Sequence, residues 1–156
     1  MYSYSNSAFG IIGRLIEVVR GISWYQAMQD SIYQALGMTH AIADPAEAIR
    51  YRAAMGHVCK DGTSDQWQLA EKAYLPLGLA PVGSTPTMSA ASLITFARAH
   101  LDKGLSHSGE CWLSTASIAE MQKPQIELPK HSQISRKYAL VFIEFTLVPI
   151  DRFLIQ

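Results

Sequence analysis

The feature that most constrains the fold is a run of apolar residues at helical spacing near the start of the chain. Over residues 7–21 the large apolar side chains recur every three or four positions, the period of one helix face. They are Phe9, Ile12, Leu15, Ile16 and Val19. This pattern predicts a helix whose continuous apolar stripe is buried against a core. The tripeptide Tyr4-Ser5-Asn6 stands directly before the run.

Tyr4 and Asn6 allow two interpretations. In the first, the tripeptide caps the helix and packs an aromatic ring against the core. In the second, a phenol and a carboxamide two residues apart are held at the edge of a core and face a cleft. The tripeptide alone favours the first interpretation, and the order of the elements that follow favours the second.

Three further helices are indicated by their ends. A helix over 23–38 has capping-box spacing at Ser23 and Gln26, and Gly37 suits a left-handed residue after its last turn. A helix from about 89 to 101 ends at Lys103-Gly104, and a shorter one over 114–121 stops before Pro124. The apolar face of the helix over 89–101 is expected to consist of Leu93, Phe96, Ala97 and Leu101.

The segments between these helices are less regular. Asp44 and Pro45 predict the cap and first position of a short helix, and Gly56-His57-Val58 predicts a brief strand. Residues 60–65 predict an exposed loop, and residues 74–86 an ordered, non-helical stretch. From Tyr138 onward the composition is strand-like. That run is too short for a membrane span, and it carries Glu144.

This succession of elements resembles the serine β-lactamase-like family, which contains class C β-lactamases, penicillin-binding D-alanyl-D-alanine carboxypeptidases and related esterases. The resemblance covers about residues 2 to 129. It is carried by Tyr4-Ser5-Asn6 with its helix and by the ending Leu36-Gly37-Met38. It implies a mostly α chain, the helical region of a β-lactamase-like α/β fold, with a few short strands and an incomplete sheet. Two parts are expected: residues 1–130 as the central helical region and residues 131–156 as a divergent apolar tail.

In this family a serine attacks an amide or ester carbonyl, and water then releases the acyl group. The resemblance implies that Tyr4 relays the proton between nucleophile and leaving group and that Asn6 orients the substrate. The nucleophile belongs to a Ser-x-x-Lys motif, yet no serine of this chain has a lysine three positions later. No Lys-Thr-Gly or His-x-Gly motif follows residue 129, and His107-Ser108-Gly109 lies in an expected loop.

The function therefore has two hypotheses. The first is a fragment of a serine hydrolase that cleaves a β-lactam, D-Ala peptide or ester and is inactive alone, because the motif for its nucleophile is missing. The second is a small helical interaction module with a vestigial hydrolase pattern. A substrate of the complete family member is a small acyl compound or peptide, and self-association through exposed apolar surface is a further expectation. Whether this chain is itself an enzyme stays open.

Composition excludes other classes of partner. Lysine plus arginine equals aspartate plus glutamate at 13 each, which gives no electrostatic basis for binding nucleic acid or an anionic membrane. The five histidines are scattered, so neither a metal site nor a cofactor is expected. Cys59 and Cys111 are compatible with a disulfide, but two separate thiols are favoured. The start lacks the pattern of a signal peptide, and the localisation is left unassigned.

Overall fold

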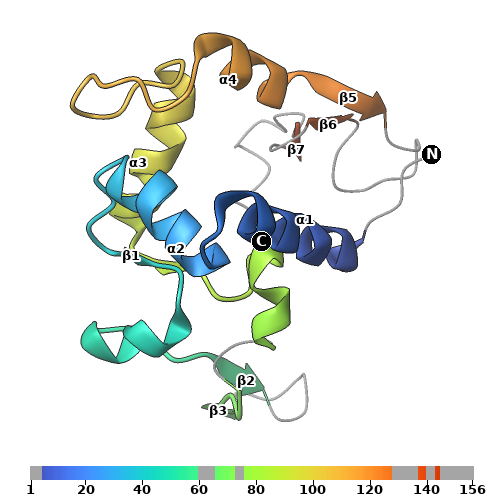
Figure 1. Ribbon diagram of the computed structural model, residues 1–156. Helices are drawn as coiled ribbons and strands as arrows, with labels where there is room; N and C mark the ends of the chain where they lie inside the picture. Colours follow the sequence, from blue (N-terminus) through green and yellow to red (C-terminus); the bar gives the residue numbers. More distant parts are fainter. Residues whose placement is uncertain (1–4, 60–65, 73–75, 128–136, 140–142, 145–156) are drawn as a thin grey trace, which may run out of the picture. The chain divides into compact units, whose positions relative to one another are not determined.

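The computed structural model describes residues 5–59, 66–72, 76–127, 137–139 and 143–144 (Figure 1). The chain divides into two compact units, one of residues 5–98 and one that contains the described residues from 99 onward. Among the described residues, helices dominate and the short strands form two two-stranded sheets and one three-stranded sheet. The predicted fold class, mostly α with an incomplete sheet, is confirmed.

Helix α1 spans Asn6–Arg20, as the sequence predicts, and local side chains and dihedral angles define both ends. Ser5 has an extended backbone, and its hydroxyl oxygen accepts a hydrogen bond from the amide of Ala8 at 3.3 Å. Gly21 follows the last turn with a φ of 68°, and its amide donates to the carbonyl oxygen of Glu17 at 2.8 Å.

The predicted burial of the apolar stripe on α1 is wrong. Phe9 and Ile12 are each 50% exposed, Leu15 is 58% exposed and Val19 is 73% exposed. The helix instead packs its glycine face, with Gly13 buried, against the 3-10 helix η3 (Leu77–Val82). The periodicity identified an apolar face correctly, but α1 packs through its glycines, and this face stays mostly exposed within the described part of the chain.

The predicted helix over 23–38 consists of two parts. Helix α2 (Trp24–Met28) continues into a π-helical segment, η1 (Gln29–Gln34), which the sequence pattern did not indicate. Ser23 caps α2 by accepting from the amide of Gln26 at 3.2 Å. The side-chain amide of Gln26 does not reach back to Ser23 but donates forward to Asp30 at 2.9 Å.

The core of this unit lies under α2, η1 and the chain that follows them. Trp24 and Met38 are both buried, at 8% and 4% exposure. The amide of Met38 donates to the carbonyl oxygen of Tyr33 at 2.7 Å, and Gly37 has a φ of 70°, as expected for this type of helix end. The remaining buried apolar residues of residues 5–98 are Ala27, Tyr33, Leu36, Ala41, Ile42, Ala43, Pro45 and Ala80.

A short antiparallel sheet closes this core. Strand β1 (Ala41–Ile42) pairs with β4 (Thr87–Met88), with Ala41 opposite Met88. The buried hydroxyl of Ser92, four residues after β4, accepts a hydrogen bond from the amide of His40 at 3.3 Å. The amide of Ser92 in turn donates to the hydroxyl oxygen of Ser89 at 3.2 Å. These bonds join the start of the next helix to the strand.

The segments between β1 and β4 agree only in part with the sequence pattern. The 3-10 helix η2 (Pro45–Arg50) follows Asp44, which accepts from the amide of Ala46 at 2.9 Å as predicted. The expected strand is present as β2 (His57–Cys59), paired antiparallel with β3 (Trp67–Leu69). The expected loop over 60–65 lies outside the described residues. The stretch over 74–86 was predicted to be non-helical, but it contains η3. Pro76 stands at the cap of this segment and Pro81 lies inside it.

Helix α3 spans Ala90–Leu101. The turn that follows it contains Gly104, whose φ is 92°, as predicted. The predicted apolar face is wrong, because Leu93 is 54% exposed, Leu101 is 78% exposed and Ala97 is exposed. The buried residues are Ser92, Ala99 and His100. Ser92 tolerates burial because its hydrogen bonds are satisfied.

The unit from residue 99 onward contains helix α4 (Thr115–Gln122). It also contains strands β5 (Pro124–Glu127), β6 (Lys137–Ala139) and β7 (Ile143–Glu144), and these three strands form one antiparallel sheet in that order. Ser114 caps α4 by accepting from the amide of Ser117 at 3.1 Å. His107-Ser108-Gly109 lies in a turn, as expected. Most of residues 131–156 lie outside the description, so a boundary near 130 stays a prediction.

Two further sequence expectations concern the chain as a whole. No disulfide joins Cys59 and Cys111, and the Cys111 thiol is exposed. Within the described ranges, no helix has both the length and the apolar character needed to cross a membrane.

Candidate functional site

The two residues that the sequence singled out lie at the start of α1. Tyr4 is outside the described residues, and Asn6 is the first residue of the helix. The Asn6 side chain is exposed, and its carboxamide makes no hydrogen bond to any residue in the described part of the chain. Since Ser5 provides the helix cap, the amide group of Asn6 is available to another molecule.

The position of Asn6 depends on how α1 is fixed against η3. Gly13 lies so close to Pro81 that a Cβ atom added at Gly13 would overlap the proline ring. One turn earlier, a Cβ atom at Gly10 would lie 3.7 Å from the carbonyl oxygen of Gly78, an ordinary van der Waals distance. Close packing of this kind leaves the helix little freedom to shift along η3.

A second anchor joins α1 to α2 through the carboxylate of Glu17. This carboxylate accepts hydrogen bonds from the Arg14 guanidinium at 2.9 Å and from the backbone amide of Trp24 at 3.1 Å. The hydrogen bond from Arg14, followed by the one from Trp24, lowers the pKa of Glu17 below its ordinary value of 4.5. Glu17 is therefore ionised at neutral pH and holds the end of α1 to the start of α2.

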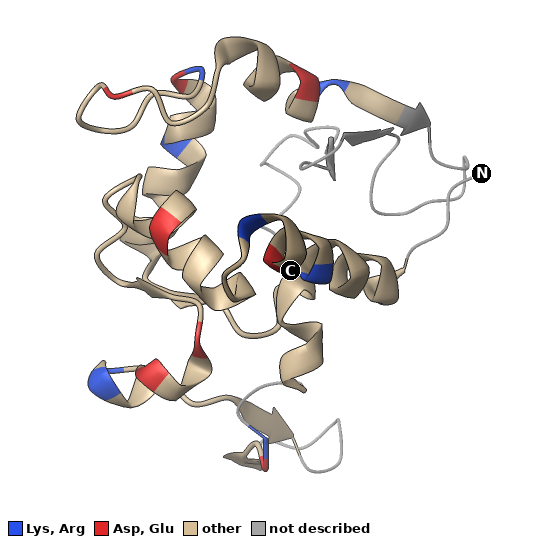
Figure 2. Cartoon of the chain, viewed as in Figure 1, with Lys and Arg blue, Asp and Glu red and all other residues tan. Residues whose placement is uncertain are grey.

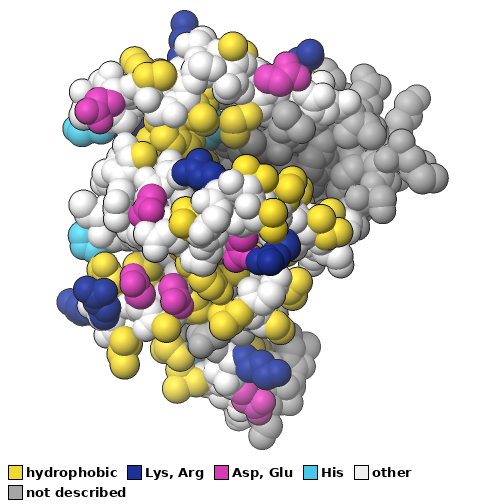
Figure 3. Space-filling model, viewed as in Figure 1, with side chains coloured by type: hydrophobic (Ala, Val, Ile, Leu, Met, Phe, Trp, Pro, Cys, Tyr) yellow, Lys and Arg dark blue, Asp and Glu magenta, His cyan; other side chains and the backbone are white. Residues whose placement is uncertain are grey.

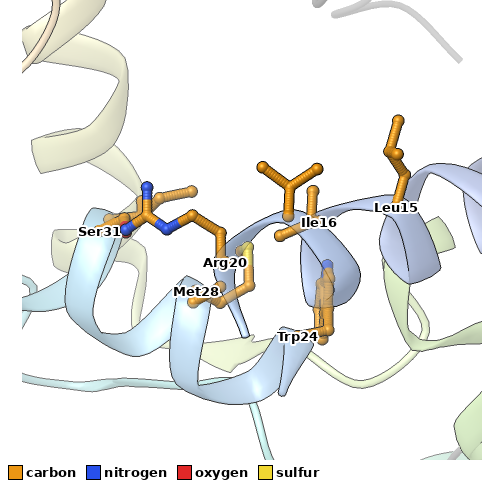
Figure 4. A pocket seen from close by; sticks show the side chains of 9 residues that line it. Leu15, Ile16, Arg20, Trp24, Met28 and Ser31 are labelled. Carbon is orange, nitrogen blue, oxygen red and sulfur yellow. The ribbon is translucent and has the colours of Figure 1, made fainter. Parts of the chain in front are cut away.

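Between α1 and the α2–η1 segment lies an apolar groove of about 420 Å³ (Figure 4). Its walls are Leu15, Ile16, Val19, Trp24, Ala27, Met28 and Ile32, with Arg20 and Ser31 among them. The guanidinium of Arg20 donates to the Ser31 hydroxyl oxygen at 3.1 Å. No site was predicted here from the sequence. The apolar stripe on α1 was the signal, and it was read as part of the core.

A second hollow, of about 290 Å³, is more polar and is lined in part by Tyr33, Thr39, Glu47 and Tyr51. Tyr33 is 2% exposed, and its hydroxyl has no hydrogen-bond partner within the described residues. Burial raises the pKa of Tyr33 to about 12, so this phenol gives up its proton less readily than an ordinary tyrosine. It is not a substitute for Tyr4 in a proton relay.

Metal chemistry has no visible support in the part of the chain that the structure covers. No three histidine, cysteine, aspartate or glutamate side chains among those residues lie together as ligands. The thiol of Cys111 donates to the carbonyl oxygen of Leu113 at 3.5 Å.

Comparison with known proteins places this arrangement in a family. Residues 1–124 match the family described as Beta-lactamase. Penicillin-binding protein 4 of Amycolatopsis lactamdurans is 36% identical over 125 residues, which cover 78% of this chain and 31% of that protein. The chain thus spans about a third of the length of this relative.

Solved structures share the fold at low sequence identity. The octameric penicillin-binding protein homologue from Pyrococcus abyssi aligns with a TM-score of 0.68 at 20% identity, over 83% of this chain and 27% of that one. The class C β-lactamase from Rhodobacter sphaeroides gives 0.61 at 23% identity, over 89% and 35%. D-amino acid amidase from Ochrobactrum anthropi SV3 gives 0.67 at 17% identity, over 89% and 38%. With four-fifths of its residues matched and with α1 beginning at Asn6 of Tyr4-Ser5-Asn6, the chain belongs to the β-lactamase family.

Proposed function

We propose that this chain supplies the tyrosine and asparagine part of an acyl-transfer centre in a serine hydrolase of the β-lactamase family. Tyr4 relays a proton between the nucleophile and the leaving group, and Asn6 donates a hydrogen bond that orients the substrate. The observation that carries the proposal is the placement of Asn6. Its exposed carboxamide belongs to the first residue of α1, and Gly13 and Glu17 fix this helix in position.

The attacking group has to come from outside these 156 residues. A tyrosine phenol has an ordinary pKa of about 10 and needs a neighbouring cation to act as a base near neutral pH. The family motif that provides both serine and lysine has no counterpart in this sequence. We therefore expect the chain alone to form no acyl-enzyme.

The first experiment tests this absence. The purified chain is incubated with nitrocefin and with a short-chain p-nitrophenyl ester, and its intact mass is measured over time. We expect neither a burst of product nor an increase in the mass of the chain. Acylation of any serine would refute the statement that the nucleophile lies elsewhere.

A second experiment tests Tyr4 and Asn6 in a complete protein. The chain replaces the matched 125 residues of the Amycolatopsis penicillin-binding protein 4, and labelling of this chimera by a fluorescent penicillin is followed. Tyr4→Phe is expected to slow labelling by about 10²–10⁴-fold, the usual contribution of a proton-transfer group. Tyr2→Phe, which removes a phenol two residues earlier, should leave the rate unchanged. Asn6→Ala should slow it less than Tyr4→Phe, and equal rates for Tyr4→Phe and the parent would refute the role.

A second candidate function, a helical interaction module, is favoured by one observation. The aliphatic face of α1 is exposed, with Ile11 at 72% and Val18 at 66%. Self-association through this face and binding of a different polypeptide are the two forms that such a module can take. An octameric homologue is known from Pyrococcus abyssi, and sedimentation equilibrium of the purified chain measures whether this chain also assembles.

A further inference from the structure

The polar hollow of about 290 Å³ has a smaller neighbour of about 230 Å³. Gln29 of η1 and Glu47 of η2 line both hollows, so the two adjoin where these segments lie next to each other. The other lining residues come from η1, from α2 with its cap, and from the chain between residues 37 and 51. All of them belong to the unit of residues 5–98. The two hollows together are called the polar recess.

The π-helical turns of η1 shape one wall of the polar recess. In such turns each backbone hydrogen bond joins a residue to the fifth one along the chain. Residues four or five positions apart therefore come to the same side of the segment, as Gln29, Tyr33 and Gln34 do here. π-Helical turns are rare and are found frequently at functional sites. In η1 they place two carboxamides and a phenol in the wall of one recess.

The hydroxyl of Tyr33 lacks the partner that a buried polar group ordinarily has. Tyr33 is 2% exposed, and its hydroxyl makes no hydrogen bond to the residues that the structure describes. Buried polar atoms are nearly always paired, and an unpaired one in a native structure points to a bound group or a functional role. Because Tyr33 lines the recess, a polar group that enters the recess can supply this hydrogen bond.

The polar recess is negatively charged. The described residues that line it include Asp44 and Glu47 but no lysine, arginine or histidine. One oxygen of Asp44 accepts from the amide of Ala46, and Glu47 lies 3.8 Å from the exposed Arg50, a long distance for an ion pair. Figure 2 shows the acidic and basic positions along η2, and Figure 3 shows side chains of both charges at the surface there. The recess therefore favours a cation.

Aromatic and apolar side chains indicate the kind of cation. Tyr51 lines the recess, is 42% exposed and stands edge-on to the His40 ring at a centroid distance of 6.4 Å. The face of a tyrosine ring attracts an ammonium group. Met38 and Ile42 are buried and give the recess an apolar wall, against which an aliphatic stem can pack. A divalent metal ion fits less well, because no three potential ligand side chains lie together in the described part of the chain.

We propose that the polar recess binds a primary ammonium group carried on an aliphatic stem. The three N–H bonds of the ammonium donate to the Glu47 carboxylate, the Tyr33 hydroxyl oxygen and the Gln29 carboxamide oxygen, and the stem lies along the apolar wall. A free alkylamine and the lysine side chain of a peptide both carry this group. Binding involves neither Tyr4 nor Asn6, so it can be tested independently of the proposed function.

The test titrates the isotope-labelled full chain with Nα-acetyl-lysine amide and with pentylamine, and two-dimensional NMR follows the backbone amides at neutral pH. Nα-acetyl-norleucine amide, which has the aliphatic stem without the ammonium, is the control ligand. We expect both amines to shift the amides of η1 and η2 and the norleucine compound to leave them in place. Tighter binding of the lysine compound would identify a peptide side chain as the ligand, and tighter binding of pentylamine a free amine.

Tyr33→Phe distinguishes a ligand-binding hydroxyl from a structural one. It removes a buried polar atom that has no partner among the described residues. The free chain should therefore keep or raise its Tm, while binding of the lysine compound weakens about two- to tenfold. A lower Tm with unchanged binding would assign the hydroxyl to the fold alone and overturn its role.

Glu47→Gln should weaken binding about two- to fivefold, as for a partly exposed ion pair. Glu71→Gln is the matched control, because Glu71 is an exposed carboxylate of the same unit that does not line the recess. Its binding should equal that of the parent chain. Two further results would overturn the proposal. The first is that neither amine shifts the amides of η1 and η2 more than the norleucine compound does. The second is that Glu47→Gln and Glu71→Gln bind equally well.

Discussion

Gly13 sets how closely α1 approaches η3, and it offers the sharpest test of the packing. Gly13→Ala places a methyl group where it overlaps the Pro81 ring, so we expect the free energy of unfolding to fall by about 1–3 kcal/mol, as for other overpacked sites. Gly10→Ala is the matched control, because its methyl group would have 3.7 Å of room. Alanine favours helix over glycine by about 1 kcal/mol, so this variant should be unchanged or more stable. Urea unfolding of both variants measures the difference, and equal destabilisation would contradict the close approach.

Glu17 makes one part of the stability depend on pH. Its folded pKa is lowered, first by the hydrogen bond from Arg14 and then by the one from Trp24. The carboxylate therefore stabilises the fold above its unfolded value of about 4.5, and this contribution disappears as the pH falls through the lowered folded value. At pH 7 we expect Glu17→Gln to have a lower Tm than the parent chain.

The difference in Tm between the parent and Glu17→Gln should shrink as the pH is lowered below 4.5. Differential scanning fluorimetry from pH 3 to pH 7 measures it. A difference that stays constant over this range would show that the hydrogen bonds of Glu17 do not depend on its charge. Glu120→Gln is a suitable control, since Glu120 lies 3.7 Å from Lys123 in an exposed pair.

At the scale of the element, α3 shows that burial follows hydrogen bonding and contacts rather than hydropathy. Ser92 is 4% exposed, and its neighbour Leu93 is 54% exposed. Ser92→Ala leaves the amide of His40 without its acceptor, which should cost about 1–3 kcal/mol. Leu93→Gln should change the free energy of unfolding by less than about 0.5 kcal/mol, as for other exposed positions. Thermal or urea unfolding of the two variants compares them, and a larger loss for Leu93→Gln would reverse our assignment of the faces.

The helices show which properties of an element can be predicted from sequence. The start of α2 and the start of α4 were predictable, because Ser23 and Ser114 cap their helices with their own side chains. The buried faces of α1 and α3 were not predictable, because burial depends on which distant segment packs there. The π-helical turn after Met28 also left no local signal that we recognised. For the candidate site, the sequence indicated Asn6 and Tyr4 but not the groove beside Arg20.

At the scale of the whole molecule, exposed apolar surface and net charge act together on solubility. The chain has a net charge of zero with neutral histidines, and its isoelectric point is about 7.0. Long-range electrostatic repulsion between copies of the chain is therefore weakest near neutral pH, where the exposed aliphatic face of α1 can make contacts. Below the isoelectric point the chain carries a net positive charge.

We therefore expect the lowest solubility near pH 7 and a higher value at pH 5.5, measured as the concentration that remains in solution at increasing polyethylene glycol. Leu15→Asp and Ile49→Asp add the same charge, so charge alone would raise solubility at pH 7 equally in both. If the aliphatic face of α1 is the surface that associates, Leu15→Asp must raise the solubility at pH 7 further than Ile49→Asp does. Equal effects would assign the self-contacts to surface outside α1. A solubility that falls between pH 7 and pH 5.5 would show that charge does not control them.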